Sequence, residues 1–128
     1  VNTPQSLDVV VASNLFGDII TDLGGALQGS LGLPASANLN PERDYPSMFE
    51  PVHGSAPDVA GKGIANPMAA IWAAALMLEH LNELHAAELV MRALATVARG
   101  GPRTPDLGGT GITTEVGGAI AERVRGAG

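Results

Sequence analysis

The sequence predicts an α/β fold, and three features indicate it. A β-branched run at residues 8–12 (DVVVA) is typical of a buried strand in a parallel sheet. Short segments that begin at Ser36 and Met48 are candidates for further strands. Apolar residues recur at helical spacing in four other segments: 15–28, 67–82, 86–99 and 113–125. Helices that alternate with short strands favour a layered α/β arrangement.

Composition limits the classes of function. A chain of 128 residues, 45% hydrophobic and 16% charged, can form one domain with a real core. The net charge of −6 disfavours nucleic-acid binding, which needs a basic face. The sequence has no cysteine, which excludes disulfides and thiolate metal sites and fits a reducing cytoplasm. No apolar run is long enough to span a bilayer, so a membrane partner is not expected.

The segment 15–28 is predicted to be a helix with an apolar stripe at four-residue spacing. Asp18 and Asp22 lie four residues apart, so their carboxylates share one face of this helix. They could form a solvated acidic face near the helix start, where negative charge is favourable. They also lie just beyond the end of the predicted strand, where α/β ligand sites form, with no Lys or Arg nearby. Two unpaired carboxylates suit Mg²⁺ or Mn²⁺.

A long segment at 48–67 connects a candidate strand to the second helix and is rich in small residues. Small residues let the backbone approach a ligand, and backbone N–H groups are good donors to phosphate or ribose oxygens. Asn66 is expected to cap the helix, with Pro67 at its first position. His53 and Asp58 are the other polar candidates. An ordinary surface turn is the alternative, because neither a G-x-G-x-x-G nor a P-loop fingerprint is present.

The remaining motifs give weaker indications of a functional site. His80 and His85 flank a predicted turn between helices and are expected at the surface, and the three histidines have no spacing typical of zinc sites. The glycine-rich segment 108–111 is interpreted as a plain loop. The sequence does not begin with Met, so the chain could be the tail of a longer protein or a processed chain.

Several of these segments resemble one family, the metal-dependent β-decarboxylating dehydrogenases, which include the isopropylmalate, isocitrate, tartrate and D-malate enzymes. The resemblance rests on residues 14–22 (NLFGDIITD), 29–32 (GSLG) and 50–58 (EPVHGSAPD), through Asn66 and Pro67. It runs through essentially the whole chain, in the family's order, but covers only the family's C-terminal third.

Three shorter segments are most similar to the tartrate and D-malate branch: 40–43, 46–49 and 71–72.

The resemblance implies a fold and a division of the chain. Members are homodimers of two-domain subunits, with an isopropylmalate dehydrogenase-like mixed sheet flanked by helices that differs from a Rossmann domain. Residues 1–29 then correspond to the end of the smaller, dimer-forming domain, with its strand and metal-binding helix. Residues 30–128 correspond to the C-terminal half of the larger, cofactor-binding domain.

The resemblance also assigns roles to individual residues. Asp18 and Asp22 match metal ligands, and Asn14 lies where members approach substrate and nicotinamide. Asp58 is placed at the adenosine ribose, where a carboxylate accepts from both hydroxyls and repels a 2′-phosphate, so it favours NAD over NADP. The full set of implied cofactor-binding residues is Asn14, His53, Gly54, Ser55, Ala56, Asp58, Asn66 and Asp106.

The function that follows is NAD-dependent, Mg²⁺- or Mn²⁺-dependent oxidation and decarboxylation of a 2-hydroxy dicarboxylic acid such as tartrate or D-malate. Isopropylmalate is the alternative substrate. An alternative of another class is a non-catalytic nucleotide-binding module or assembly fragment. The family's acid–base Lys and Tyr have no match in this chain, so its catalytic residues are unknown. The isolated 128-residue chain is therefore expected to be inactive and to bind cofactor weakly.

Overall fold

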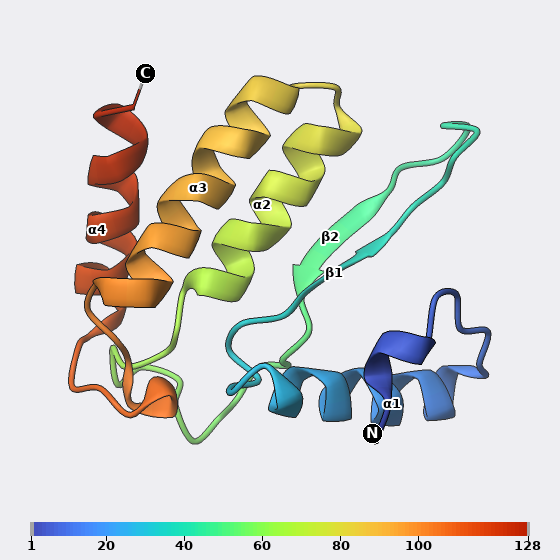
Figure 1. The fold of residues 1–128 in the computed structure, drawn as a ribbon, viewed down its shortest axis with the longest axis horizontal. Helices are drawn as coiled ribbons and strands as arrows, with labels where there is room; N and C mark the ends of the chain where they lie inside the picture. Colours follow the sequence, from blue (N-terminus) through green and yellow to red (C-terminus); the bar gives the residue numbers. More distant parts are fainter. Residues whose placement is uncertain (1, 128) are drawn as a thin grey trace.

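A computed structural model describes residues 2–127. Figure 1 shows α4, α3, α2 and a two-stranded hairpin lying in succession, with α1 across the end at which α2 begins. The four predicted helices are confirmed, with bounds that differ from the prediction by two residues or fewer. The candidate strands near Ser36 and Met48 are confirmed as well. The elements are η1 (Pro4–Ser6), α1 (Asn14–Leu27), β1 (Ala35–Asn38), β2 (Met48–Pro51), α2 (Met68–His80), α3 (Leu84–Gly100), η2 (Pro105–Leu107) and α4 (Thr113–Arg125).

The hairpin pairs β1 with β2 in antiparallel register, from Ala35 opposite Pro51 to Asn38 opposite Met48. Both strands contact α2, so the sheet covers one side of that helix. The pairing continues one step further, because the Val52 N–H donates to the carbonyl before β1. The start of the long segment at 48–67 is therefore fixed in place by the sheet.

The turn between the strands is fixed to the C-terminal end of α2. The Arg43 guanidinium donates to the His80 carbonyl at 2.7 Å, a favourable position for a cation at a helix C-terminus. The His80 ring lies 5.5 Å from the Phe49 ring between centroids. His80 is only partly exposed, whereas His85 is exposed as predicted.

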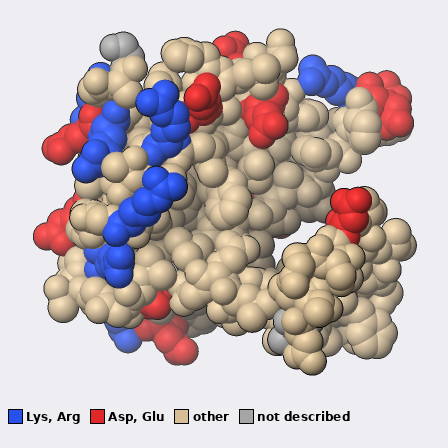
Figure 2. All heavy atoms as spheres, viewed as in Figure 1, with Lys and Arg blue, Asp and Glu red and all other residues tan. Residues whose placement is uncertain are grey.

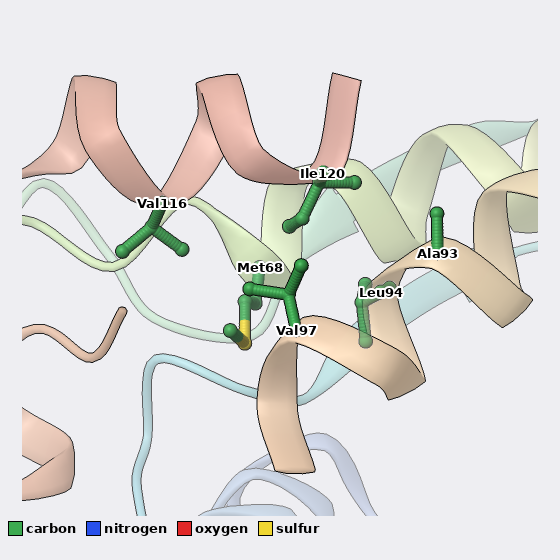
Figure 3. Packing of buried hydrophobic residues seen from close by; sticks show 6 residues of the cluster. All are labelled: Met68, Ala93, Leu94, Val97, Val116 and Ile120. Carbon is green, nitrogen blue, oxygen red and sulfur yellow. The ribbon is translucent and has the colours of Figure 1, made fainter. Parts of the chain in front are cut away.

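The hydrophobic core lies between α2, α3 and α4, as Figure 3 shows. Met68, Val97 and Val116 are fully buried there. Burial of such side chains contributes roughly 1.5–3 kcal/mol each. α2 is not buried on all sides, because Ala70, Ala74 and Met77 remain exposed.

Residues 8–12 correct the prediction of a buried strand, because they form no strand and their side chains are exposed. Val9 and Val11 are 85% and 94% exposed. A strand needs a neighbour to pair its N–H and C=O groups, and no described segment lies beside this one as a strand. The β-branched pattern therefore predicted a buried strand that residues 2–127 do not form.

The apolar stripe of α1 is exposed in the same way. On the face seen in Figure 2, the part of the molecule formed by α1 shows little charge, whereas Lys and Arg gather over α3 and α4. The exposed apolar side chains of α1 are Leu15, Phe16, Ile19, Ile20, Leu23 and Leu27. The division of the chain at residue 29 stays a prediction. Within residues 2–127, no helix combines the length and apolarity required to cross a membrane.

Candidate functional site

A pocket of about 500 Å³ lies at the end of the molecule where α2 begins. Figure 1 shows three connecting segments meeting there: the chain after α1, the segment between β2 and α2, and the segment around η2. Backbone and apolar side chains form most of its wall, with few polar groups. The lining residues are Ser30, Leu31, Gly32, His53, Ala56, Val59, Ile64, Ala65, Asn66, Pro105 and Asp106.

Asn66 links two of these segments. Its amide Nδ2 donates to Asp106 Oδ2 at 3.0 Å, and its Oδ1 accepts the Met68 N–H at 3.0 Å. The second bond satisfies a free N–H at the start of α2, which is the capping role predicted for Asn66. The helix itself starts at Met68, so Pro67 occupies the N-cap position and not the first helical position that was predicted for it. Asn66 is therefore buried and fixed at both ends of its amide.

Ser30 brings the third segment into the same network. Its hydroxyl donates to Asp106 Oδ2 and accepts the Gly32 N–H at 2.9 Å. The Gly32 carbonyl in turn accepts the Ala69 N–H from α2 at 3.2 Å. The pocket wall is thus a continuous hydrogen-bonded unit that spans all three segments.

Asp106 is an acceptor for this network. Partial burial of its carboxyl acts to raise its pKa, but hydrogen bonds from Ser30, Asn66 and its own backbone outweigh this and lower the pKa below 3.8. The neighbouring Thr104 hydroxyl adds to the lowering, although no hydrogen bond of normal geometry pairs this buried group. Asp106 is therefore ionised at neutral pH.

The small-residue segment at 53–66 is ordered by its own backbone. Ala56 adopts a left-handed conformation with φ of 41°, and its carbonyl accepts the N–H groups of Val59 and Ala60. At the other end, Thr113 at the start of α4 donates its N–H to Gly63 and its hydroxyl to Ala65, at 2.8 and 2.6 Å. These contacts hold the segment against the pocket, whose residues 53, 56, 59 and 64–66 contribute to the lining.

The structure brings together four of the residues predicted to bind cofactor: His53, Ala56, Asn66 and Asp106 line the pocket. Gly54, Ser55 and Asp58 lie in the same segment, exposed and outside the lining. Asn14 begins α1 and does not line the pocket.

Asp18 and Asp22 lie on α1, exposed and one turn apart, as their spacing predicts. Among residues 2–127, no three His, Cys, Asp or Glu side chains are grouped closely enough to hold a metal ion. Two carboxylates on one helix face are suitable ligands for Mg²⁺ or Mn²⁺ but form only part of a ligand set. The two carboxylates are therefore compatible with a divalent ion whose other ligands would come from elsewhere.

Sequence reasoning missed a large part of the pocket wall, including Ser30, Gly32, Ile64 and Pro105. The motif at 29–32 contributed to the family resemblance but received no role in the site. A signal was present, since a serine between two glycines leaves both the hydroxyl and the backbone free to approach a neighbour. Ile64, an isolated large apolar residue in a small-residue segment, was a second signal.

The arrangement suits one class of ligand. An apolar slot with an amide at its edge and a backbone-rich segment beside it fits a flat heterocyclic ring joined to a polar group, as in a nucleotide. The chain matches the family model "Isocitrate/isopropylmalate dehydrogenase" over residues 1–120, and it belongs to that family.

Close relatives agree with this family. The chain is 57% identical over 123 residues to a probable tartrate dehydrogenase/decarboxylase of Agrobacterium vitis, covering 96% of this chain and 34% of the relative. It is 53% identical over 124 residues to the decarboxylating D-malate dehydrogenase of Escherichia coli, covering 93% of this chain and 34% of the relative. The chain therefore spans about a third of the length of these relatives.

Solved structures show the same fold. The isocitrate dehydrogenase of Methylococcus capsulatus matches with a TM-score of 0.86 at 50% identity, over 95% of this chain and 36% of that one. A β-decarboxylating dehydrogenase of Thermococcus kodakarensis matches with a TM-score of 0.83 at 40% identity, over 98% and 36%. The prediction of an α/β fold of the isopropylmalate dehydrogenase type is confirmed.

Proposed function

We propose that the full-length protein containing this chain is an NAD-dependent dehydrogenase that oxidises and decarboxylates a 2-hydroxy dicarboxylic acid such as tartrate or D-malate. The observation that carries the proposal is the pocket closed by the Asn66–Asp106 hydrogen bond, in a chain whose close relatives are named for these two reactions. The substrate is a small molecule, and neither nucleic acid nor a membrane has a role in the proposal.

The pocket is assigned to the adenosine end of NAD. The adenine ring lies among its apolar and backbone groups, with Asn66 at the ring edge and His53 against it. Asp58, exposed next to the pocket wall, accepts hydrogen bonds from the ribose hydroxyls and repels a 2′-phosphate. This part of the chain therefore selects NAD and positions it, and takes no part in bond breaking.

The metal is assigned to α1. Asp18 and Asp22 supply two carboxylate ligands for Mg²⁺ or Mn²⁺, and Asn14 at the start of the same helix lies toward the substrate and nicotinamide. When bound, NAD supplies the hydride acceptor and the divalent ion supplies Lewis-acid stabilisation of charge on the substrate oxygen. The four-residue spacing places both aspartate carboxylates on the same face of the helix.

The proposal includes a homodimer located in the cytoplasm. The exposed apolar stripe of α1 supports an interface in that part of the full-length protein, because a contiguous exposed apolar helix face is usually covered. The absence of cysteine fits a reducing compartment.

The test is NADH formation by the purified full-length protein with tartrate, D-malate or isopropylmalate, in the presence of Mn²⁺. We expect tartrate or D-malate to support turnover, a metal chelator to abolish it, and added Mn²⁺ to restore it. The isolated 128-residue chain is expected to give no NADH under the same conditions. Full-length protein that forms no NADH with any of the three acids contradicts the proposal.

A further inference from the structure

The side-chain amide of Asn66 can adopt only one orientation. The Met68 N–H is a donor, so the group that faces it must be the amide oxygen. The ionised Asp106 carboxylate is an acceptor, so the group that faces it must be the amide nitrogen. Turning the amide over would place donor against donor and acceptor against acceptor at once, and each mismatch leaves a polar group without a partner.

Ser30 adds a second fixed donor to this arrangement. Its oxygen already accepts the Gly32 N–H, so its proton is directed to Asp106. The same carboxylate oxygen, Oδ2, receives the hydrogen bonds of both Ser30 and Asn66. Ser30 therefore holds the atom that orients the amide, and it does so from a different segment of the chain.

The oriented amide still has capacity for a ligand. Nδ2 carries a second hydrogen and Oδ1 a second lone pair, so one donor and one acceptor remain in fixed order. On its Watson–Crick edge adenine presents the 6-amine donor beside the N1 acceptor, a pair that an Asn amide can match with its oxygen and its N–H. Hypoxanthine presents the reverse on the same edge, a 6-carbonyl acceptor beside an N1–H donor. An amide free to turn could match either base, whereas a fixed one matches the first and leaves the second mismatched.

We propose that Ser30, acting through Asp106, is a positioning residue that fixes the Asn66 amide and so makes this pocket select adenine over hypoxanthine. The proposal rests on the proposed function, in which the pocket holds the base of NAD. Ser30 contacts no ligand in this account; its effect on base selection passes entirely through the carboxylate and the amide.

The test compares dissociation constants of NAD and of nicotinamide hypoxanthine dinucleotide for the full-length protein, measured by calorimetry. We expect the wild type to bind NAD more tightly by about tenfold, the range of one or two hydrogen bonds. Ser30→Ala and the isosteric Asp106→Asn are expected to bring the ratio of the two constants close to one. Ser30→Thr, which keeps the hydroxyl, is expected to retain the wild-type ratio. Thr96→Ala is the matched control, because the Thr96 hydroxyl bonds only within α3.

The ratio separates orientation from general damage. A variant that merely loosens the pocket weakens both dinucleotides equally, so an unchanged ratio in both Ser30→Ala and Asp106→Asn overturns the inference and leaves the proposed function intact. Equal binding of the two dinucleotides by the wild type overturns it in the same way. Wild-type protein that binds neither dinucleotide overturns the proposed function, and the inference with it.

Discussion

Gly32 packs directly against Asn66, so closely that a Cβ atom on Gly32 would lie 2.8 Å from the Cβ of Asn66. It would also lie 2.9 Å from Oδ2 of Asp106. Both atoms belong to the hydrogen-bonded pair at the pocket edge, and neither is the free end of a flexible chain. The segment after α1 can therefore approach the start of α2 only with glycine at this position.

Gly32→Ala should destabilise the protein and weaken its binding of NAD, because the added methyl displaces Asn66 and Asp106. The expected cost is about 1–3 kcal/mol, the range for overpacking a site that cannot relax. The measurement is the urea midpoint of the full-length protein, together with its dissociation constant for NAD. Gly118→Ala on α4 is the matched control, since a Cβ there meets nothing within 4 Å. Equal midpoints for the two variants would contradict the packing argument.

Asp58→Lys should shift cofactor use from NAD toward NADP. The change replaces repulsion of a 2′-phosphate by a charge-assisted hydrogen bond and removes an acceptor for the ribose hydroxyls. The ratio of kcat/KM for NADP to that for NAD is expected to rise about tenfold or more in the full-length enzyme. Asp44→Lys, an equal charge change in the hairpin turn, is the control. An unchanged ratio in the Asp58 variant would disprove the assignment of this residue to the ribose.

Asp18→Asn and Asp22→Asn should each weaken Mn²⁺ binding while leaving NAD binding almost unchanged. Loss of a charged ligand is expected to raise the Mn²⁺ concentration for half-maximal activity by at least about tenfold, since outer-shell changes alone have effects of that size. Asp8→Asn, an exposed acid outside α1, controls for net charge. If wild type and the three variants all required the same Mn²⁺ concentration, the assignment of the metal to α1 would be wrong.

The Asp106 carboxylate should stabilise the protein at neutral pH and lose this effect in acid. Its pKa in the folded state lies below 3.8, so its contribution is complete above that value and is lost as the pH falls through the folded pKa. The comparison is the urea midpoint of wild type and Asp106→Asn at about pH 7 and about pH 3. The wild-type advantage is expected to shrink on acidification, and an advantage equal at both values would contradict it.

The sequence was sufficient for the parts of the fold that are stabilised locally. The hydrogen bond from the Met68 N–H to Asn66 and the apolar stripe of α3 are short-range features, and both were predicted, although the helix begins one residue later than expected. The strand predicted at residues 8–12 failed because a strand depends on partners distant in sequence. We expect residues 8–12 to pair as a strand in the full-length protein. The relatives are about three times as long as this chain and could supply the partner strands.

A site residue was predictable where its own side chain has a recognisable polar group. It was unpredictable where its role depends on a contact with a residue distant in sequence. His53, Asn66 and Asp106 carry recognisable polar groups, and the structure brings all three to one pocket. Ser30 was missed because its partner, Asp106, lies 76 residues away and nothing in the local pattern links the two. Pro105 lines the pocket through backbone folding that no motif specifies.

The most direct test of the account is the crystal structure of the full-length protein with NAD bound. The adenine ring is expected in the pocket between Gly32, His53 and Asn66, with the adenosine ribose within hydrogen-bonding distance of Asp58. NAD bound elsewhere on the protein, with this pocket free of the adenine ring, would contradict it.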